Sequence, residues 1–127
     1  MSVFVLDTSA LLAIILEEPG AEAALSRVRG AQISAANLTE LISRCLDKGI
    51  MADVTMAFLA SHGVATVTHD AELARMAGVL RTATRDIGSS LGDRACLALA
   101  IREGATAVTA DRIWATLDLG CKIELIR

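Results

Sequence analysis

Short apolar runs alternate along the chain with longer segments in which apolar residues recur every three or four positions. The short runs predict strands and the longer periodic segments predict helices. Strands are predicted over residues 3–6, 32–34, 64–68, 107–109 and 122–126. Helices are predicted over residues 9–16, 21–28, 36–48, 51–61, 71–77, 91–102 and 112–117. Strands joined by such long helical connections are typical of an α/β fold with a parallel sheet.

Three segments refine this pattern. Gly78 follows the periodic segment 71–77 and predicts its end, because glycine is common just after the last turn of a helix. Residues 81–90 have no clear period, and residues 91–102 are apolar nearly all round. The second of these segments is therefore expected to be a helix buried on most sides.

The composition favours one soluble domain over residues 1–127. The chain is 54% hydrophobic and contains no repeat or Pro/Gly/Ser-rich linker. Asp7 interrupts the N-terminal apolar stretch, and the apolar run that follows it is far shorter than the roughly 20 residues of a spanning helix. No basic region precedes that stretch, so a secretory signal is not predicted and a cytoplasmic location is expected. The cysteines are odd in number and far apart in the sequence: Cys45, Cys96 and Cys121. They are therefore predicted to be buried thiols rather than disulfides or zinc ligands.

Charge gives no global attraction for nucleic acid, because the net charge is −3. Aromatic residues make up only 2% of the chain, which disfavours base stacking as the main mode of RNA binding. Phosphate contacts would then come from arginines, whose guanidinium groups can grip two oxygens. The candidates are Arg44, Arg81, Arg85, Arg94 and Arg112. Each of them could equally be a solvated or ion-paired surface residue.

Four acidic residues fall at predicted junctions between elements. They are Asp7, Glu40, Asp93 and Asp111. Asp7 and Asp111 each follow a predicted strand, and ligands of open α/β sheets lie outside the carboxyl ends of strands. Taken singly, each of these two could be a helix cap, and Ser90 to Asp93 has the spacing of a capping box. Glu40 lies in a polar stripe with Asn37 and Arg44, and a surface pair with Arg44 would explain it.

Gathered by the fold, these carboxylates would need a counter-cation. Two carboxylates about 4 Å apart repel by roughly 4 kcal/mol at an effective dielectric of 20. Oxygen-only ligation suits Mg²⁺ or Mn²⁺ better than zinc. Such ions promote phosphodiester hydrolysis by holding phosphate oxygens and activating water.

The chain resembles the PIN-domain family, and within it the VapC ribonuclease toxins of bacterial toxin–antitoxin pairs. Four stretches carry the resemblance in the same order along essentially the whole chain: Val5-Leu-Asp7-Thr-Ser-Ala-Leu-Leu-Ala13, Asn37-Leu-Thr-Glu40, Leu91-Gly-Asp93-Arg-Ala-Cys-Leu-Ala-Leu-Ala100 and Thr109-Ala-Asp111-Arg-Ile-Trp114. The resemblance implies a three-layer α/β/α sandwich with a central, mostly parallel sheet. It also implies Mg²⁺- or Mn²⁺-dependent endonucleolytic cleavage of RNA.

Residue roles follow from the resemblance. Asp7 and Asp93 are expected to be direct metal ligands, and Asp111 a ligand directly or through water. Glu40 is expected to be an outer ligand or to orient the attacking water. The expected supporting residues are Thr8, Ser9, Asn37 and Thr109. A VapB-like antitoxin that places a basic side chain in the acidic site is the expected partner, together with a homodimer or a larger assembly such as a heterotetramer.

Two other classes fit the same sequence. A non-catalytic interaction module could use the acidic residues to dock a basic segment without any metal. A phosphoacceptor receiver-like domain would also have this α/β order, with Lys122 as its late lysine, but no second acidic residue accompanies Asp7. Metal binding would separate the nuclease from the module, and uptake of phosphate from a small donor would identify the receiver.

Overall fold

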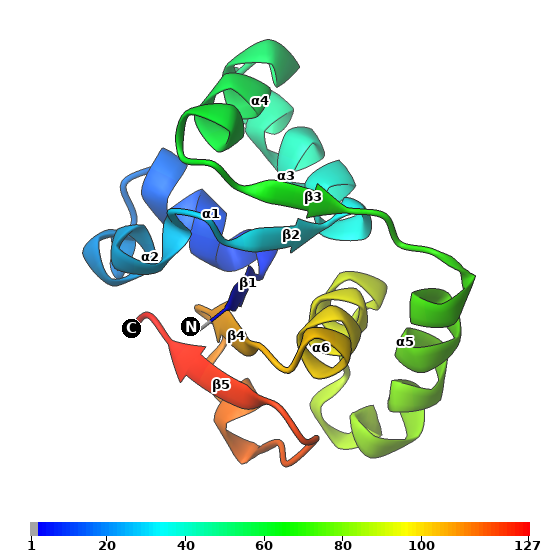
Figure 1. Ribbon diagram of the computed structural model, residues 1–127. Helices are drawn as coiled ribbons and strands as arrows, with labels where there is room; N and C mark the ends of the chain where they lie inside the picture. Colours follow the sequence, from blue (N-terminus) through cyan, green and yellow to red (C-terminus); the bar gives the residue numbers. More distant parts are fainter. Residues whose placement is uncertain (1–2) are drawn as a thin grey trace.

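A computed structural model describes residues 3–127 as a central sheet flanked by helices (Figure 1). The strands are β1 (Phe4–Leu6), β2 (Gln32–Ser34), β3 (Ala65–Val67), β4 (Thr106–Thr109) and β5 (Lys122–Leu125). The α-helices are α1 (Thr8–Ile15), α2 (Ala21–Val28), α3 (Ala35–Asp47), α4 (Ala52–Ser61), α5 (Ala71–Ala83) and α6 (Leu91–Glu103). Two 3₁₀ helices complete the order, η1 (Arg85–Ile87) and η2 (Arg112–Thr116).

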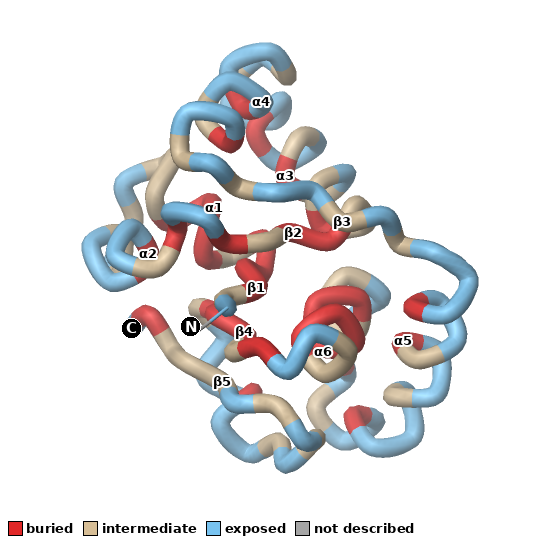
Figure 2. Tube along the Cα trace, viewed as in Figure 1, coloured by how far each residue is buried: buried red, intermediate tan, exposed pale blue. Residues whose placement is uncertain are grey.

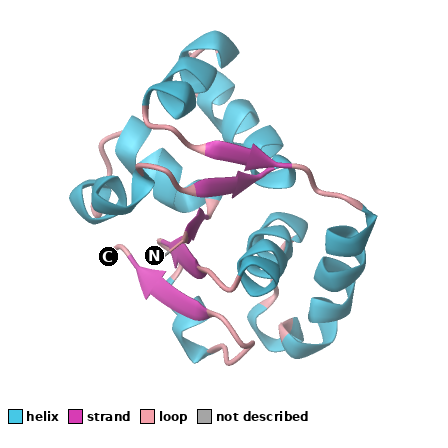
Figure 3. Ribbon diagram, in the orientation of Figure 1, coloured by secondary structure: helices cyan, strands magenta, loops and turns pink. Residues whose placement is uncertain are grey.

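The five strands form a parallel sheet in the order β3-β2-β1-β4-β5, as Figure 3 shows in magenta. Val5 of β1 is level with Gln32 on one side and Ala107 on the other. From β1 the chain proceeds to β2, and from β4 it proceeds to β5 in the opposite direction across the sheet. The carboxyl ends of β1 and β4 therefore flank the topological switch point, where open α/β sheets bind ligands.

Strands β1, β2 and β4 are mostly buried, as expected when helices cover a parallel sheet on two sides, whereas the edge strand β3 is largely exposed (Figure 2). Successive residues of a strand point to opposite faces, and the two central strands follow this rule. Leu6 and Val108 pack into the core formed with α1, α2, α3 and α4. Val5 and Ala107 pack into the other core, formed with α5 and α6 and closed by the fully buried Trp114. This arrangement confirms the predicted α/β/α layers.

Most predicted elements agree with the structure to within one or two residues, but one helix end is wrong. Helix α5 does not stop before Gly78 and continues to Ala83. Glycine ends a helix best in a left-handed conformation, and Gly78 does not adopt a positive φ. Leu80, which follows the glycine, packs against the same core as Leu73 and Ala77, so packing continues the helix past Gly78.

Two expectations from composition can also be compared with the structure. Cys45 and Cys96 are buried, as predicted, whereas Cys121 is only partly buried near the start of β5. All three are free thiols. Within residues 3–127, the helices are too short or too polar for any of them to span a membrane.

Candidate active site

The four acidic residues singled out in the sequence line one cavity of about 160 Å³ at the carboxyl edge of the sheet. They come from four different elements: the residue before α1, the middle of α3, the first turn of α6 and the residue before η2. The lining residues are Asp7, Thr8, Ser9, Leu12, Glu40, Arg44, Asp93 and Asp111. The fold thus brings together side chains that are up to about a hundred positions apart in sequence.

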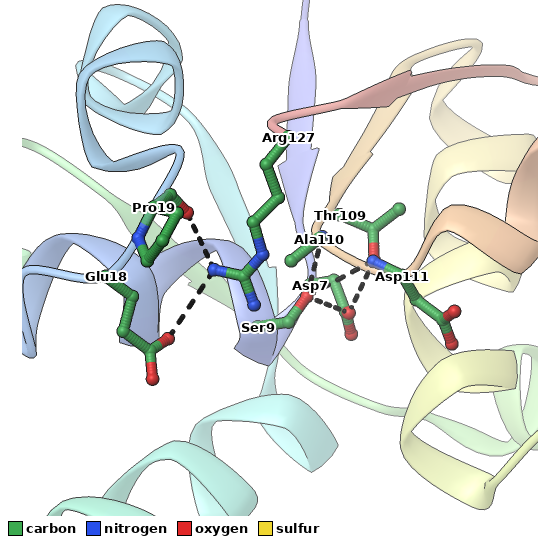
Figure 4. A network of polar contacts seen from close by, with 8 residues as sticks. All are labelled: Asp7, Ser9, Glu18, Pro19, Thr109, Ala110, Asp111 and Arg127. Carbon is green, nitrogen blue, oxygen red and sulfur yellow. Dashed lines mark hydrogen bonds and ion pairs between the residues drawn. The ribbon is translucent and has the colours of Figure 1, made fainter.

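Asp7 is held by hydroxyl groups at the switch point, as Figure 4 shows. Its Oδ2 accepts hydrogen bonds from Ser9 Oγ at 2.7 Å and from Thr109 Oγ1 at 2.9 Å. Ser9 Oγ in turn accepts a bond from the Ala110 backbone N–H at 2.9 Å, and Thr109 Oγ1 accepts one from the Asp111 N–H at 3.1 Å. The hydroxyls are therefore oriented by the backbone that follows β4, and they direct their protons toward the carboxylate.

The cap interpretation of Asp7 is wrong. Asp7 occupies the N-cap position of α1, but its side chain makes no capping hydrogen bond. The carboxylate turns instead toward Thr109 of β4, and the residue is only 5% exposed. Thr8 does not support the carboxylate either, because its hydroxyl donates to the Asn37 carbonyl at 3.3 Å.

Burial raises the pKa of Asp7 from 3.8 to about 6. The hydrogen bonds from Ser9 and Thr109 oppose this shift because they stabilise the charged form. The negative charges of Asp93 and Glu40 add to it. A buried carboxylate beside two others holds its negative charge at a free-energy cost, which a cation in the cavity would reduce.

Asp93 and Asp111 both act as caps while lining the cavity. Asp93 Oδ2 accepts from the Ser90 N–H at 2.9 Å and Ser90 Oγ accepts from the Asp93 N–H, which confirms the predicted capping box. Burial also raises the pKa of Asp93; the hydrogen bonds to Ser90 lower it, and the charges of Asp111 and Glu40 raise it. Asp111 is exposed, and its Oδ1 accepts from the Ile113 N–H at 3.2 Å.

Helix α3 contributes Glu40 and Arg44 to the cavity, but the predicted surface stripe is only partly correct. Asn37 is completely buried, because α3 turns Asn37, Leu41 and Cys45 toward the core. Among the described residues, no ion pair joins Glu40 to Arg44. Glu40 therefore faces the cavity without the salt bridge that would have explained it as a surface residue.

The sequence did not single out Gly92 as part of this site. A side chain at this position would meet Glu40, because a Cβ on Gly92 would stand 3.0 Å from Glu40 Oε1. The available signal in the sequence was the position of this glycine inside the first turn of a predicted helix. Glycine destabilises a helix, so a glycine there indicates that a neighbouring group leaves no room for a side chain.

Of the five candidate arginines, only Arg44 lines the cavity. Arg94 lies between α5 and α6, where its guanidinium donates to the Ala77 carbonyl at 3.2 Å. Arg112 donates to the Arg127 carbonyl at 3.0 Å. Arg81 and Arg85 are exposed on the last turn of α5 and on η1. Arg44 is thus the one candidate that shares the cavity with the acidic residues.

The donor set suits a divalent ion that prefers oxygen ligands. Asp7 and Asp93 each keep one carboxylate oxygen that accepts no hydrogen bond from residues 3–127, and so does Asp111. In the described part of the chain, no three His, Cys, Asp or Glu side chains are drawn together tightly enough to enclose an ion. Asp93 and Asp111 each use one carboxylate oxygen for a capping bond.

The receiver-like interpretation does not fit the arrangement. Lys122 is the first residue of β5 and is level with Thr106, the first residue of β4. It therefore lies at the edge of the sheet opposite the carboxyl ends, and it lines a different cavity there. A lysine in this position cannot reach a phosphoryl group on Asp7.

Comparison with known proteins agrees with this geometry. The family model described as PIN domain matches residues 4–119. A toxin–antitoxin complex from Klebsiella pneumoniae is similar in structure, with a TM-score of 0.76, 18% identity and coverage of 100% of this chain and 98% of that one. DNA-bound VapBC from Salmonella typhimurium gives a TM-score of 0.72 at 20% identity, with 100% of both chains covered.

A sarcin–ricin-loop-cleaving VapC toxin from Mycobacterium tuberculosis also gives a TM-score of 0.72 at 20% identity, with 95% of this chain and 99% of that one covered. No curated protein sequence is significantly similar to this chain. At such identities the structural likeness establishes the fold alone. The family match, however, extends from β1 past η2 and includes all four acidic residues of the cavity. The chain therefore belongs to the PIN-domain family.

Proposed function

We propose that this chain is a metal-dependent endoribonuclease that hydrolyses RNA phosphodiester bonds and acts as the toxin of a VapC-type toxin–antitoxin pair. One observation carries the proposal: Asp7, Glu40, Asp93 and Asp111 come from four elements to line a single cavity at the switch point of a parallel sheet. The raised pKa of Asp7 supports it, since burial destabilises the negative charge of this carboxylate and a bound cation would offset that cost.

Mg²⁺ or Mn²⁺ is the proposed cofactor, held by Asp7, Asp93 and Asp111, with Glu40 as an outer ligand. When bound, such an ion supplies positive charge to phosphate oxygens and lowers the pKa of a water molecule. The protein's own residues orient the reactants. Ser9 and Thr109 fix one oxygen of Asp7, so the other faces the cavity in a defined direction.

Glu40 and Arg44 of α3 have different proposed roles, one toward the attacking water and the other toward the RNA phosphate. The Glu40 carboxylate lies in the cavity without an ion-pair partner among residues 3–127, so it is suited to accept a proton from an attacking water or to orient it. Arg44 lies one helical turn further along, where it can contact a phosphate of the RNA strand. The low aromatic content leaves phosphate contacts, rather than base stacking, as the main source of RNA affinity.

A VapB-like antitoxin and self-association are part of the proposal. Several neighbours are toxin–antitoxin assemblies by description, including the complexes from Klebsiella and Salmonella. A basic antitoxin side chain would be attracted to the acidic cavity. Exposed apolar residues at the start of α4, on α4 and on α5 offer surface for a homodimer or a heterotetramer: Met51, Val54, Met56 and Val79.

The direct test is cleavage of RNA by purified Asp7→Asn and Asp93→Asn variants in Mg²⁺ or Mn²⁺. Both should lose cleavage while circular dichroism and thermal unfolding remain native-like. Asp53→Asn is the matched control, because Asp53 is an exposed acidic residue in the first turn of α4, outside the cavity. Undiminished cleavage by both site variants would overturn the assignment.

A non-catalytic docking module is the second candidate. It is favoured by the capping bonds of Asp93 and Asp111, which give one oxygen of each carboxylate a structural role. Titration calorimetry with Mn²⁺ separates the two functions. The nuclease should bind Mn²⁺ in a manner that Asp7→Asn weakens, whereas the docking module should show no such binding and no cleavage.

A further inference from the structure

Asn37 is a buried amide at the junction of three helices. The residue is completely inaccessible to solvent. Its Nδ2 donates to the Gly92 carbonyl of α6 at 3.0 Å and to Thr8 Oγ1 of α1 at 3.3 Å. The Thr8 hydroxyl donates back to the Asn37 carbonyl at 3.3 Å. Both amide protons of one side chain are thus used to tie α3 to two other helices.

Each residue in this junction stands beside a carboxylate of the cavity. Thr8 directly follows Asp7, and Gly92 directly precedes Asp93. Asn37 precedes Glu40 by three residues, which places the two side chains on neighbouring positions of the α3 surface. The hydrogen bonds of one amide therefore set the relative positions of the backbone segments that carry three of the four acidic residues.

Gly92 keeps the space into which Glu40 fits. A Cβ at this position would stand 3.0 Å from Glu40 Oε1 and 3.5 Å from Asn37 Nδ2. Its backbone has no positive φ and lies in the first turn of an α-helix, so any residue could adopt it. The glycine is consequently needed for close approach and not for its conformational freedom.

We propose that Asn37 and Gly92 together form a positioning unit that holds Glu40 against the first turn of α6 and fixes its place relative to Asp7 and Asp93. The inference deepens the proposed nuclease function and rests on it for its kinetic consequence. Asn37 and Gly92 are positioning residues and not catalytic ones, because neither lines the cavity. Asn37 bonds Thr8 and the backbone of Gly92, and Gly92 lies against Glu40. Their effect is on the rate of the chemical step, through the placement of Glu40.

Gly92→Ala is the cleanest probe of this unit. The added methyl group meets the far end of a flexible side chain, so the fold can accommodate it while Glu40 moves. Gly78→Ala is the matched control, because Gly78 also lies inside a helix without a positive φ, and a Cβ there meets nothing within 4 Å. Alanine introduces no backbone strain in either variant, because neither glycine has a positive φ.

With RNA and Mn²⁺, Gly92→Ala should lower kcat at least about tenfold with little change in KM, whereas Gly78→Ala should match the wild type. In the metal-free proteins, the ¹³C resonance of the Glu40 carboxyl and the Asn37 side-chain amide resonances should shift in Gly92→Ala only. Asn37→Leu, which keeps most of the volume but removes both hydrogen bonds, should reproduce the loss in kcat if it folds.

The inference is overturned if Gly92→Ala and Gly78→Ala have the same kcat, or if the Glu40 and Asn37 resonances are the same in both. These outcomes are distinct from failure of the nuclease assignment, which would appear as absence of cleavage by the wild type itself. In that event the resonances alone decide: a shift specific to Gly92→Ala supports the positioning unit, and its absence overturns it.

Discussion

Thr109 Oγ1 donates a 2.9 Å hydrogen bond to Asp7 Oδ2, although the two residues are 102 positions apart in sequence. The bond joins the carboxyl ends of β4 and β1, which are neighbours in the sheet. Thr109 is completely buried and Asp7 is almost so. Because Thr109 Oγ1 also accepts from the Asp111 N–H, its proton has a fixed direction toward the carboxylate. The Thr109 hydroxyl therefore stabilises the negative charge of Asp7 and offsets part of the cost of burying it.

Thr109→Val should weaken the site while preserving its shape. The variant removes the donor to Asp7, so the pKa of Asp7 should rise further above about 6. Loss of a hydrogen bond to a charged group should reduce the free energy of unfolding at pH 7 by about 1.5–3 kcal/mol. In RNA cleavage, the acidic limb of the pH profile should move to higher pH. Thr109→Ser keeps the donor and should retain the wild-type profile; equal profiles for Val and Ser would contradict the role given to the hydroxyl.

In the metal-free protein, Asp7 should contribute stability that is lost as the pH rises through the acidic range. Its pKa is about 6 in the folded state and near 3.8 when unfolded, so between these values the folded state binds more protons. Stability from protonated Asp7 is therefore fully present below about pH 4 and is lost as the pH rises past about 6. The loss is on the order of 3 kcal/mol. Asp93, whose pKa is also raised, contributes in the same direction.

Asp7→Asn isolates this contribution, since asparagine does not titrate. The difference in unfolding free energy between the variant and the wild type, measured by denaturant titration with a chelator present, should grow in favour of the variant from pH 4 to pH 7. Asp53→Asn changes an exposed acid outside the cavity and should show no such trend. A difference that stays constant over this range would show that burial does not penalise the Asp7 charge.

Local sequence patterns predicted most helices and strands correctly. The predictions failed where contacts between distant segments decide the structure. Residues 21–28 and 32–34 were predicted with the observed bounds, because periodicity and strand propensity act within a few residues. The end of α5 was wrong because packing against α6 outweighs the roughly 1 kcal/mol cost of one glycine in a helix.

In the site too, contacts between residues close in sequence were predictable, whereas contacts between distant segments were not. The capping box of Asp93 was visible in the sequence because its partners lie three residues apart. Asp7 has the same local signature of a cap, yet its carboxylate is taken by a hydroxyl from β4. The spacing of the residues around Asp7 does not reveal that choice, and Thr109 was expected to support the site only through the family resemblance. The need for space at Gly92 likewise arises from Glu40 on another helix.

Arg44→Ala should impair RNA binding more than chemistry. The side chain is exposed and lines the cavity, so it can contact a phosphate without being part of the acidic cluster. KM for RNA should rise several-fold with a smaller change in kcat, and the slope of log affinity against log salt should fall by about one. Arg29→Ala, an exposed arginine at the end of α2, should leave both quantities unchanged. An identical salt slope for the wild type and Arg44→Ala would rule out the phosphate contact.

Gly20→Ala should destabilise the protein. The size of the loss measures how strongly the turn between α1 and α2 is held against the segment after β5. Gly20 has a φ of +92°, and a Cβ there would lie 2.7 Å from the Ile126 carbonyl oxygen. Next to it, Arg127 Nη1 donates to the Pro19 carbonyl at 2.7 Å, as Figure 4 shows. Alanine must therefore displace the chain after β5 as well as adopt a left-handed backbone.

Gly30→Ala separates these two costs, because Gly30 has a φ of +72° but a Cβ there meets nothing within 4 Å. The left-handed conformation should cost about 1–2 kcal/mol in both variants. The overlap with Ile126 should cost Gly20→Ala a further 1–3 kcal/mol or so, as overpacking typically does. Chemical denaturation of the two variants measures the difference directly. Equal losses would mean that the segment after β5 moves aside freely, and that its contacts with Gly20 and Pro19 contribute little to stability.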